Sequence, residues 1–77
     1  MTGLSDKVLI EFGGRLRDVR SSREMSQEAL AELAELDRTY ISLLERGKRN
    51  PSLVCIAKLA QALSVTVSEL FNFDEGR

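Results

Sequence analysis

Apolar residues recur every three or four positions along most of this 77-residue chain. In the first such stretch, Val8, Phe12, Leu16 and Val19 follow one another at intervals of four, four and three residues, which places them on one face of an α-helix. Runs of β-branched residues that alternate with polar ones are few, and Pro51 is the only proline. The pattern therefore predicts an all-α fold, without a sheet and built as a single domain over residues 1–77.

The expected helices are short and have recognisable ends. They cover residues 6–22, 27–34, 38–46, 52–63 and 66–71. Ser26, Asp37 and Thr66 can each cap the helix that follows, because a side-chain oxygen accepts a hydrogen bond from the first turn. Glu69 stands three residues after Thr66, which is the spacing of a capping box. Gly47 stands where a helix would end in a left-handed residue.

Two features of the sequence predict how these helices pack. Gly13 and Gly14 lie in the middle of the first helix, where each costs about 1 kcal/mol relative to alanine. We interpret them as sites of close helix packing rather than as a hinge. Cys55 is expected to be a small core residue. The fourth helix is expected to bury one face, formed by Leu53, Ile56, Ala57, Ala60 and Leu63.

Residues 27–46 form the most informative segment, because a tight break separates two short helices there. Ala31 places a small side chain in the middle of the first of these helices, which allows the two to cross closely at a steep angle. Leu36, Ile41 and Leu44 are expected to fill the angle between them. The segment therefore has the pattern of a helix-turn-helix.

In a helix-turn-helix, the first turn of the second helix lies in the major groove of DNA. Arg38 can donate two hydrogen bonds to guanine there, and Thr39 can combine a methyl contact with a hydroxyl hydrogen bond. Ser42 also points outward and can reach a base edge. Gln27 begins the preceding helix, whose N-terminus attracts a phosphate. These residues predict double-stranded DNA as the partner.

The formal net charge of −1 argues weakly against a nucleic-acid partner, since such domains are usually basic. The distribution of charge matters more. Residues 24–37 contain five acidic residues and no basic one, whereas residues 38–49 contain four basic residues and one acidic one. Lys48 and Arg49 follow the second helix of the motif, so phosphate binding is favoured over a merely solvated loop. Of the arginines in the first helix, which are more often solvated, Arg17 is kept as a phosphate candidate.

Three segments together carry a specific motif: SQEALA at 26–31, LDRTYIS at 36–42 and LERGKRNP at 44–51. This motif resembles the lambda-repressor-like (Xre/Cro) helix-turn-helix family, and the resemblance runs from about residue 12 to residue 71. Residues 36–42, followed by Glu45 and Arg46, also resemble the controller proteins of restriction–modification systems. The resemblance implies a five-helix lambda-repressor-like DNA-binding domain. It also implies a transcriptional regulator that binds a near-palindromic operator as a homodimer.

The resemblance gives roles to individual residues. The base-reading or groove-lining positions of the family are matched by Arg38, Thr39, Tyr40 and Ser42. The positions that hold the phosphate backbone are matched by Gln27, Arg46, Arg49 and Asn50. Family members of this length dimerise through their final helices, here residues 52–71, so the interface candidates are Leu63, Val65, Val67, Leu70 and Phe71. From the residues alone, Tyr40 remains divided between core packing and a phosphate contact.

One residue departs from the family pattern. Glu35 stands between the two helices where the family usually has a glycine. A left-handed conformation at a residue with a side chain costs about 1–2 kcal/mol. The departure affects the expected geometry of the turn rather than the expected fold.

The sequence argues against an enzyme. It has no histidine, and therefore neither an imidazole base nor a histidine metal ligand. No catalytic residue, metal site, cofactor or small-molecule ligand is expected. A lone cysteine fits a reducing compartment, and no apolar run reaches the roughly 18–20 residues that span a bilayer. We therefore expect a cytoplasmic protein without a membrane partner.

The alternative is an antitoxin-like or phage-type repressor module whose main partner is another protein. Phe71 and Phe73 lie close to a polar terminus and fit a partner surface better than the monomer core. A separate neutralising tail would favour this alternative. About seven residues follow Leu70, which leaves little room for one.

Overall fold

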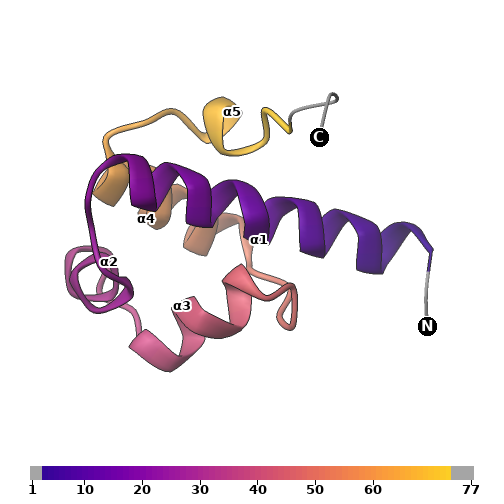
Figure 1. Cartoon of the computed structure of the whole chain (residues 1–77), viewed down its shortest axis with the longest axis horizontal. Helices are drawn as coiled ribbons and strands as arrows, with labels where there is room; N and C mark the ends of the chain where they lie inside the picture. The colour runs from indigo at the N-terminus through magenta and orange to yellow at the C-terminus, as the bar shows by residue number, and fades with distance from the viewer. Residues whose placement is uncertain (1–2, 74–77) are drawn as a thin grey trace.

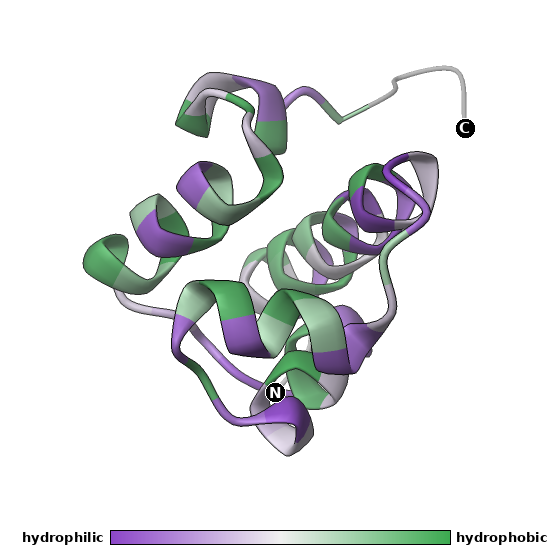
Figure 2. Cartoon of the chain, turned by 90° about the vertical axis from the view of Figure 1, so that its left-hand side faces the viewer, coloured by the Kyte–Doolittle hydropathy of each residue, from purple (hydrophilic) through white to green (hydrophobic). Residues whose placement is uncertain are grey.

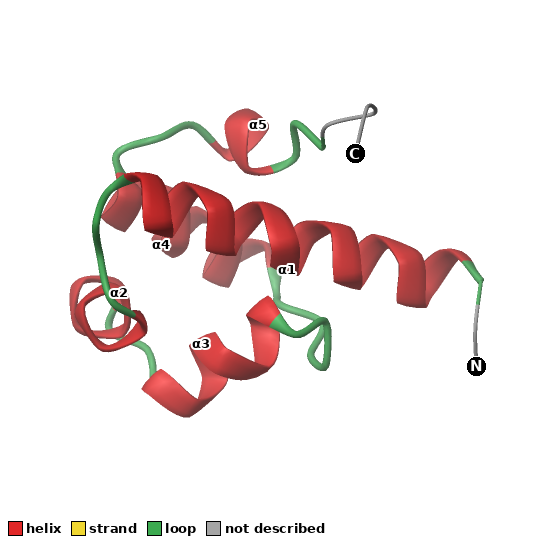
Figure 3. Ribbon diagram, viewed as in Figure 1, coloured by secondary structure: helices red, strands yellow, loops and turns green. Residues whose placement is uncertain are grey.

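The structure, a computed structural model, describes residues 3–73. In that range the chain forms helices and no strand (Figure 3). The helices are α1 (Leu4–Ser22), α2 (Gln27–Ala34), α3 (Arg38–Glu45), α4 (Leu53–Leu63) and α5 (Val67–Leu70). The long α1 runs across the molecule, with α2 and α3 on one side of it and α5 on the other (Figure 1). The predicted all-α fold is confirmed.

Side-chain caps explain where the helices begin. Ser26 accepts a hydrogen bond from the backbone N–H of Ala29 at 2.9 Å, and Asp37 accepts one from Thr39 at 2.8 Å. Ser52 caps α4 in the same way, so this helix begins at Leu53, one residue later than predicted. Each such cap contributes about 1 kcal/mol.

Thr66 and Glu69 form the predicted capping box at the start of α5. The N–H of Glu69 donates to the Thr66 hydroxyl at 3.1 Å, and the N–H of Thr66 donates to the Glu69 carboxylate at 2.8 Å. The backbone N–H and the hydroxyl of Thr66 both donate to the Glu69 carboxylate and lower its pKa. Four other helix ends differ slightly from the prediction: α1 begins two residues earlier, at Leu4, α3 ends one residue earlier, at Glu45, and α5 begins and ends one residue inside its predicted range, at Val67 and Leu70.

The core is apolar among the described residues, and hydrophobic segments recur along each helix (Figure 2). The large side chains that are fully buried are Leu16, Leu30, Ile41, Leu44, Leu59, Leu63 and Leu70. Phe12 and Val19 are also buried, whereas Val8 is 37% exposed and lies at the edge of the stripe on α1.

The predicted inner face of α4 was partly wrong. Leu53 is 76% exposed and Ala57 is exposed, whereas Cys55 and Leu59 are buried. With 3.6 residues per turn, a stripe that contains Cys55, Ile56 and Leu59 is centred about a quarter turn away from Leu53. The apolar character of Leu53 and Ala57 therefore did not indicate burial, and the predicted stripe was rotated too far.

The central helix α1 is held closely to both α3 and α5. A Cβ atom on Gly13 would lie 2.4 Å from the carbonyl oxygen of Leu44 in α3, so the predicted close packing is confirmed at Gly13. Toward α5, the Nε of Arg15 donates to the carbonyl oxygen of Glu69 at 2.8 Å. The α1 helix therefore connects α3 to α5.

The turn between α2 and α3 contains a left-handed residue without being a glycine. Glu35 has φ 59° and ψ 45°, and the N–H of Leu36 donates to the carbonyl oxygen of Ala31 at 2.8 Å. The chain thus ends α2 with the hydrogen bond of a Schellman motif. The departure from glycine at this position leaves the turn intact, at the steric cost expected for Glu35.

Candidate nucleic-acid interface

The inner face of α3 holds this helix in place and leaves its outer face free. Ile41 and Leu44 are 0% and 1% exposed. Ala31 is buried where α2 packs against α3, as the small side chain at this position predicted. Arg38 and Thr39, in the first turn of α3, are exposed. The helix therefore presents hydrogen-bonding side chains outward from a rigid base.

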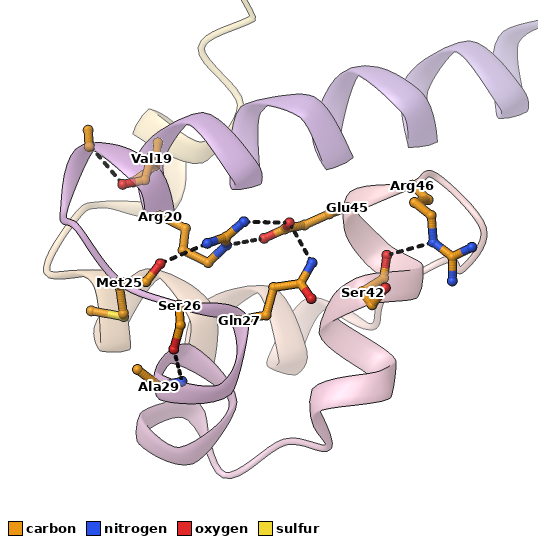
Figure 4. A network of polar contacts seen from close by, with 10 residues as sticks. Val19, Arg20, Met25, Ser26, Gln27, Ala29, Ser42, Glu45 and Arg46 are labelled. Atoms are coloured by element: carbon orange, nitrogen blue, oxygen red, sulfur yellow. Dashed lines mark hydrogen bonds and ion pairs between the residues drawn. The ribbon is translucent and has the colours of Figure 1, made fainter.

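A part-buried ion pair fixes the other end of α3 (Figure 4). The Nε and Nη2 atoms of Arg20 donate to the two carboxylate oxygens of Glu45 at 2.6 and 3.0 Å. The same guanidinium donates from Nη1 to the carbonyl oxygen of Met25 at 2.7 Å. The side chains of Arg20 and Glu45 are 14% and 3% exposed, and the hydrogen bonds to Glu45 raise the pKa of Arg20. One arginine therefore joins α1, the loop before α2, and α3.

Gln27, at the start of α2, belongs to the same network (Figure 4). Its amide donates to Glu45 at 3.0 Å. This leaves a second N–H and the amide oxygen available. Gln27 is therefore oriented by Glu45, which the sequence prediction of a phosphate contact did not anticipate.

Polar side chains from α1, α2 and α3 gather around this network in what we call the polar hollow. It is lined by Arg17, Arg20, Gln27, Ser42, Glu45 and Arg46. Three phosphate candidates (Arg17, Gln27 and Arg46) and one base-reading candidate, Ser42, thus lie side by side. Glu45 neutralises Arg20 locally, so Arg17 and Arg46 supply the net positive charge of the polar hollow.

A second hollow lies on the other flank of α3, and we call it the apolar hollow. It is lined by Glu35, Leu36, Asp37, Thr39, Tyr40, Leu43 and Arg49. It joins two base-reading candidates, Thr39 and Tyr40, to the phosphate candidate Arg49. The guanidinium carbon of Arg49 lies 5.5 Å from the centre of the Tyr40 ring, within the range of a cation–π contact.

Tyr40 is half-buried and packs against the core. Burial is the main cause that raises the pKa of its hydroxyl, and a hydrogen bond with the Cys55 thiol adds to it. Burial also raises the pKa of Cys55, which keeps the thiol protonated and fits the predicted core role. Tyr40 therefore lines the apolar hollow with its ring partly in the core, and it does not project freely outward from α3.

The loop after α3 is exposed and basic. Arg46, Lys48, Arg49 and Asn50 are all exposed. Gly47 has φ 72°, and a Cβ atom there would meet Ile10 of α1 at 2.9 Å. The left-handed glycine therefore lets the loop turn back closely against α1, with its polar side chains on the outside.

The predicted dimer interface is only partly available. Leu63 and Leu70 are 1% and 0% exposed, because they fill the core between α1, α4 and α5. In the monomer these two side chains are therefore not exposed to a partner. Val67 and Phe71 are 37% and 40% exposed. We call the remaining apolar group the C-terminal surface: Val65, Val67, Phe71 and Phe73.

Comparison with known proteins places this geometry in a family. The family described as "Helix-turn-helix domain" matches residues 11–71. The chain belongs to the helix-turn-helix family. The match spans α2, the turn and α3, together with the helices that support them.

Relatives of this helix-turn-helix chain include controller proteins. The control protein C.MunI of Mycoplasma sp is 46% identical over 66 residues, which is 84% of this chain and 89% of the relative. The solved restriction–modification controller protein C.AhdI from Aeromonas hydrophila is 54% identical, with a TM-score of 0.81, and the match covers 82% of this chain and 96% of that one. A further match is the C.Esp1396I controller protein tetramer, solved with its natural 35 base-pair operator. It is 33% identical with a TM-score of 0.77, over 83% of this chain and 84% of that one.

Two other kinds of site are absent from residues 3–73 of this helix-turn-helix chain. Within residues 3–73, no helix is long and apolar enough to cross a membrane. The same residues contain no group of three or more histidine, cysteine or acidic side chains arranged to hold a metal ion. The features that the described part of the chain presents include the two hollows beside α3, a further hollow between the basic loop and α1, and the C-terminal surface.

Proposed function

We propose that the protein is a sequence-specific transcriptional regulator that binds duplex DNA as a homodimer on a near-palindromic operator. We further propose that it is the controller protein of a restriction–modification system and not an enzyme. The observation that carries the proposal is the outer face of α3. Arg38, Thr39 and Ser42 project from a helix that the Arg20–Glu45 pair fixes in place, between hollows that bear cations on both flanks.

The arrangement matches what DNA recognition requires. Side chains on the first turn of α3 can reach base edges, while contacts on either side to phosphates fix the register of the helix in the groove. The exposed basic side chains near α3 offset the overall charge of −1, because salt screens the acidic side chains on more distant faces. The relatives are titled as controller proteins, and one was solved on its operator, which supports the same function here.

The proposal is tested by selecting binding sites from random duplex DNA with the purified protein and sequencing the retained fraction. We expect a two-fold symmetric site whose half-sites lie about one helical turn apart. Retained DNA with the same composition as the input would contradict sequence-specific recognition. The antitoxin-like alternative, with a protein as main partner, would then be preferred.

Arg38→Ala is expected to weaken binding to the selected site by about 1–3 kcal/mol and to relax the preference at one base pair in each half-site. The reason is that Arg38 is exposed at the start of α3, where a bidentate contact with guanine is possible. Binding is measured by fluorescence anisotropy on the selected site and on single-base variants. If affinity falls equally on every sequence, Arg38 is a phosphate contact instead.

Arg49→Ala is expected to change the salt dependence of binding, whereas Arg38→Ala changes the preference for a base pair. Because Arg49 lies in the basic loop beside the Tyr40 ring, we expect its loss to weaken binding to all sequences alike. The slope of log K against log salt should fall by about one unit for each subunit. A salt titration from low to moderate ionic strength measures this slope. An unchanged slope with altered base preference would show that Arg49 reads sequence.

Val67→Asp tests the C-terminal surface as the dimer interface. Val67 is partly exposed in the first turn of α5, where an acidic residue is favourable for the helix. The variant should therefore fold but raise the dissociation constant of the dimer at least about tenfold, since a charge would be buried in an apolar contact. Sedimentation equilibrium measures the change. Val54→Asp, in the first turn of α4 and 67% exposed, is the control and should remain dimeric; the opposite result would place the interface on α4.

A further inference from the structure

Two stripes of different chemistry run along the outer side of α3. Arg38 and Ser42 lie four residues apart and form a polar stripe, while Thr39 and Leu43 form a second stripe that carries methyl groups. Leu43 is partly exposed and lies outside the core cluster. The fold therefore does not require a leucine there for packing of the core.

The second stripe faces the apolar hollow. Leu36 and Tyr40 lie on its inner side and pack against the core, and Thr39 and Leu43 come from α3. Carboxylates lie at the rim: Glu35, and Asp37, which also caps α3 through Thr39 at 2.8 Å. The hollow is thus lined by apolar groups from Leu36, Tyr40 and Leu43 together with two carboxylates and Arg49.

This chemistry selects one kind of group on DNA. Glu35 and Asp37 disfavour a phosphate beside the turn, whereas they tolerate the exocyclic amino groups that adenine and cytosine present in the major groove. Arg49, which also lines the hollow, remains the phosphate candidate on this flank. The side chains of Leu36 and Leu43 offer no hydrogen bond, and they fit a methyl group. In the major groove, a methyl group occurs at C5 of thymine, and 5-methylcytosine carries it at the same place.

We propose that the apolar hollow binds the C5 methyl group of a pyrimidine in the operator, and that Leu43 is the residue that determines this specificity. The proposal rests on the proposed function and deepens it, because it states that one base pair in each half-site is recognised by Leu43 and not by Arg38. Thymine and 5-methylcytosine share the recognised group, so methylation of a cytosine at this position would strengthen binding.

The test uses the site selected from random DNA and the full-length protein. Each thymine is replaced in turn by deoxyuridine, and each cytosine by 5-methylcytosine, on both strands. At one position in each half-site, we expect removal of the methyl group to weaken binding about fourfold, the effect of burying one methyl group. If that position holds a cytosine, its methylation should strengthen binding by a similar factor. The two substitutions distinguish the two sources of the methyl group.

Leu43→Ala connects the effect to the protein. The ratio of affinities for methylated and unmethylated sites should fall to about one in this variant, since the removed side-chain carbons leave the methyl group without an apolar partner. Because the ratio compares two DNAs with one protein, it is independent of any general loss of affinity or stability. Leu53→Ala removes the same atoms from a side chain that is 76% exposed on α4 and should leave the ratio unchanged.

Three results would overturn the proposal, and they are distinguishable. A selected site at which no methyl substitution changes affinity would reject methyl recognition while the regulator function stands. A methyl effect that Leu43→Ala leaves intact would reject Leu43 as its reader. Failure to select any site would remove the proposed function and this proposal with it.

Discussion

Glu45→Ala should lower the free energy of unfolding by about 2–3 kcal/mol, somewhat less than the roughly 3–5 kcal/mol for a fully buried ion pair, because the pair is part-buried. Arg20 would keep a charged side chain that is only 14% exposed, and the Gln27 amide would lose its acceptor. In a chain of this size the melting temperature should fall by more than about 10 °C. Thermal and urea unfolding followed by circular dichroism measure both quantities.

Two further variants make this expectation specific. Glu45→Gln keeps an acceptor for one hydrogen bond without the charge, so its loss of stability should be smaller than that of Glu45→Ala. Glu11→Ala breaks the Lys7–Glu11 salt bridge, whose side chains are 66% and 40% exposed, and should cost no more than about 1 kcal/mol. Equal effects of Glu45→Ala and Glu11→Ala would show that burial of the Arg20–Glu45 pair is unimportant.

Gly13→Ala should destabilise the protein by about 3 kcal/mol, although alanine is the better helix former. The new Cβ atom would lie 2.4 Å from the carbonyl oxygen of Leu44 and 2.7 Å from that of Glu45. Both atoms belong to the backbone of α3, so α1 and α3 would have to move apart. The shift would also disturb the Arg20–Glu45 pair, and DNA affinity should fall together with stability. Chemical denaturation and anisotropy on the selected site measure the two losses.

Gly14→Ala provides the matched control. It gains the same helix propensity, but its Cβ atom points about 100° away around α1. Its loss of stability should be clearly smaller than that of Gly13→Ala. If Gly13→Ala were as stable as the wild type, the close approach of α1 to α3 would not constrain the position of α3.

Local patterns in the sequence predicted the parts of the fold that depend on nearby residues. Ser26, Asp37 and Thr66 cap helices as expected, because a cap involves a side chain and an N–H two or three residues further on. The burial of Ala31, Ile41 and Leu44 was also predicted from nearby residues, because spacing along a helix determines which residues share a face.

Features that depend on contacts between distant residues could not be predicted in this way. Arg20 and Glu45 are 25 residues apart, and each resembles an ordinary solvated charge in the sequence. Leu63 and Leu70 were assigned to an interface because apolar residues near the end of a chain serve either a core or a partner. Only the packing of α5 against α1 and α4 shows that both fill the core. The roles of the DNA-contacting residues remain predictions, which the variants above test.

The contacts of α1 have a consequence for the DNA itself. Because α1 is held to α3 near Gly13 and to α5 through Arg15 and the Phe12–Phe71 ring pair at 5.3 Å, the reading helix and the C-terminal surface behave as one rigid unit. In the proposed dimer, the two reading helices therefore have a fixed rotational phase. One base pair inserted between the half-sites turns one of them by about 35° around the DNA axis. The protein cannot follow that turn by bending. A change in the spacing between the half-sites should therefore weaken binding as much as a change in their sequence.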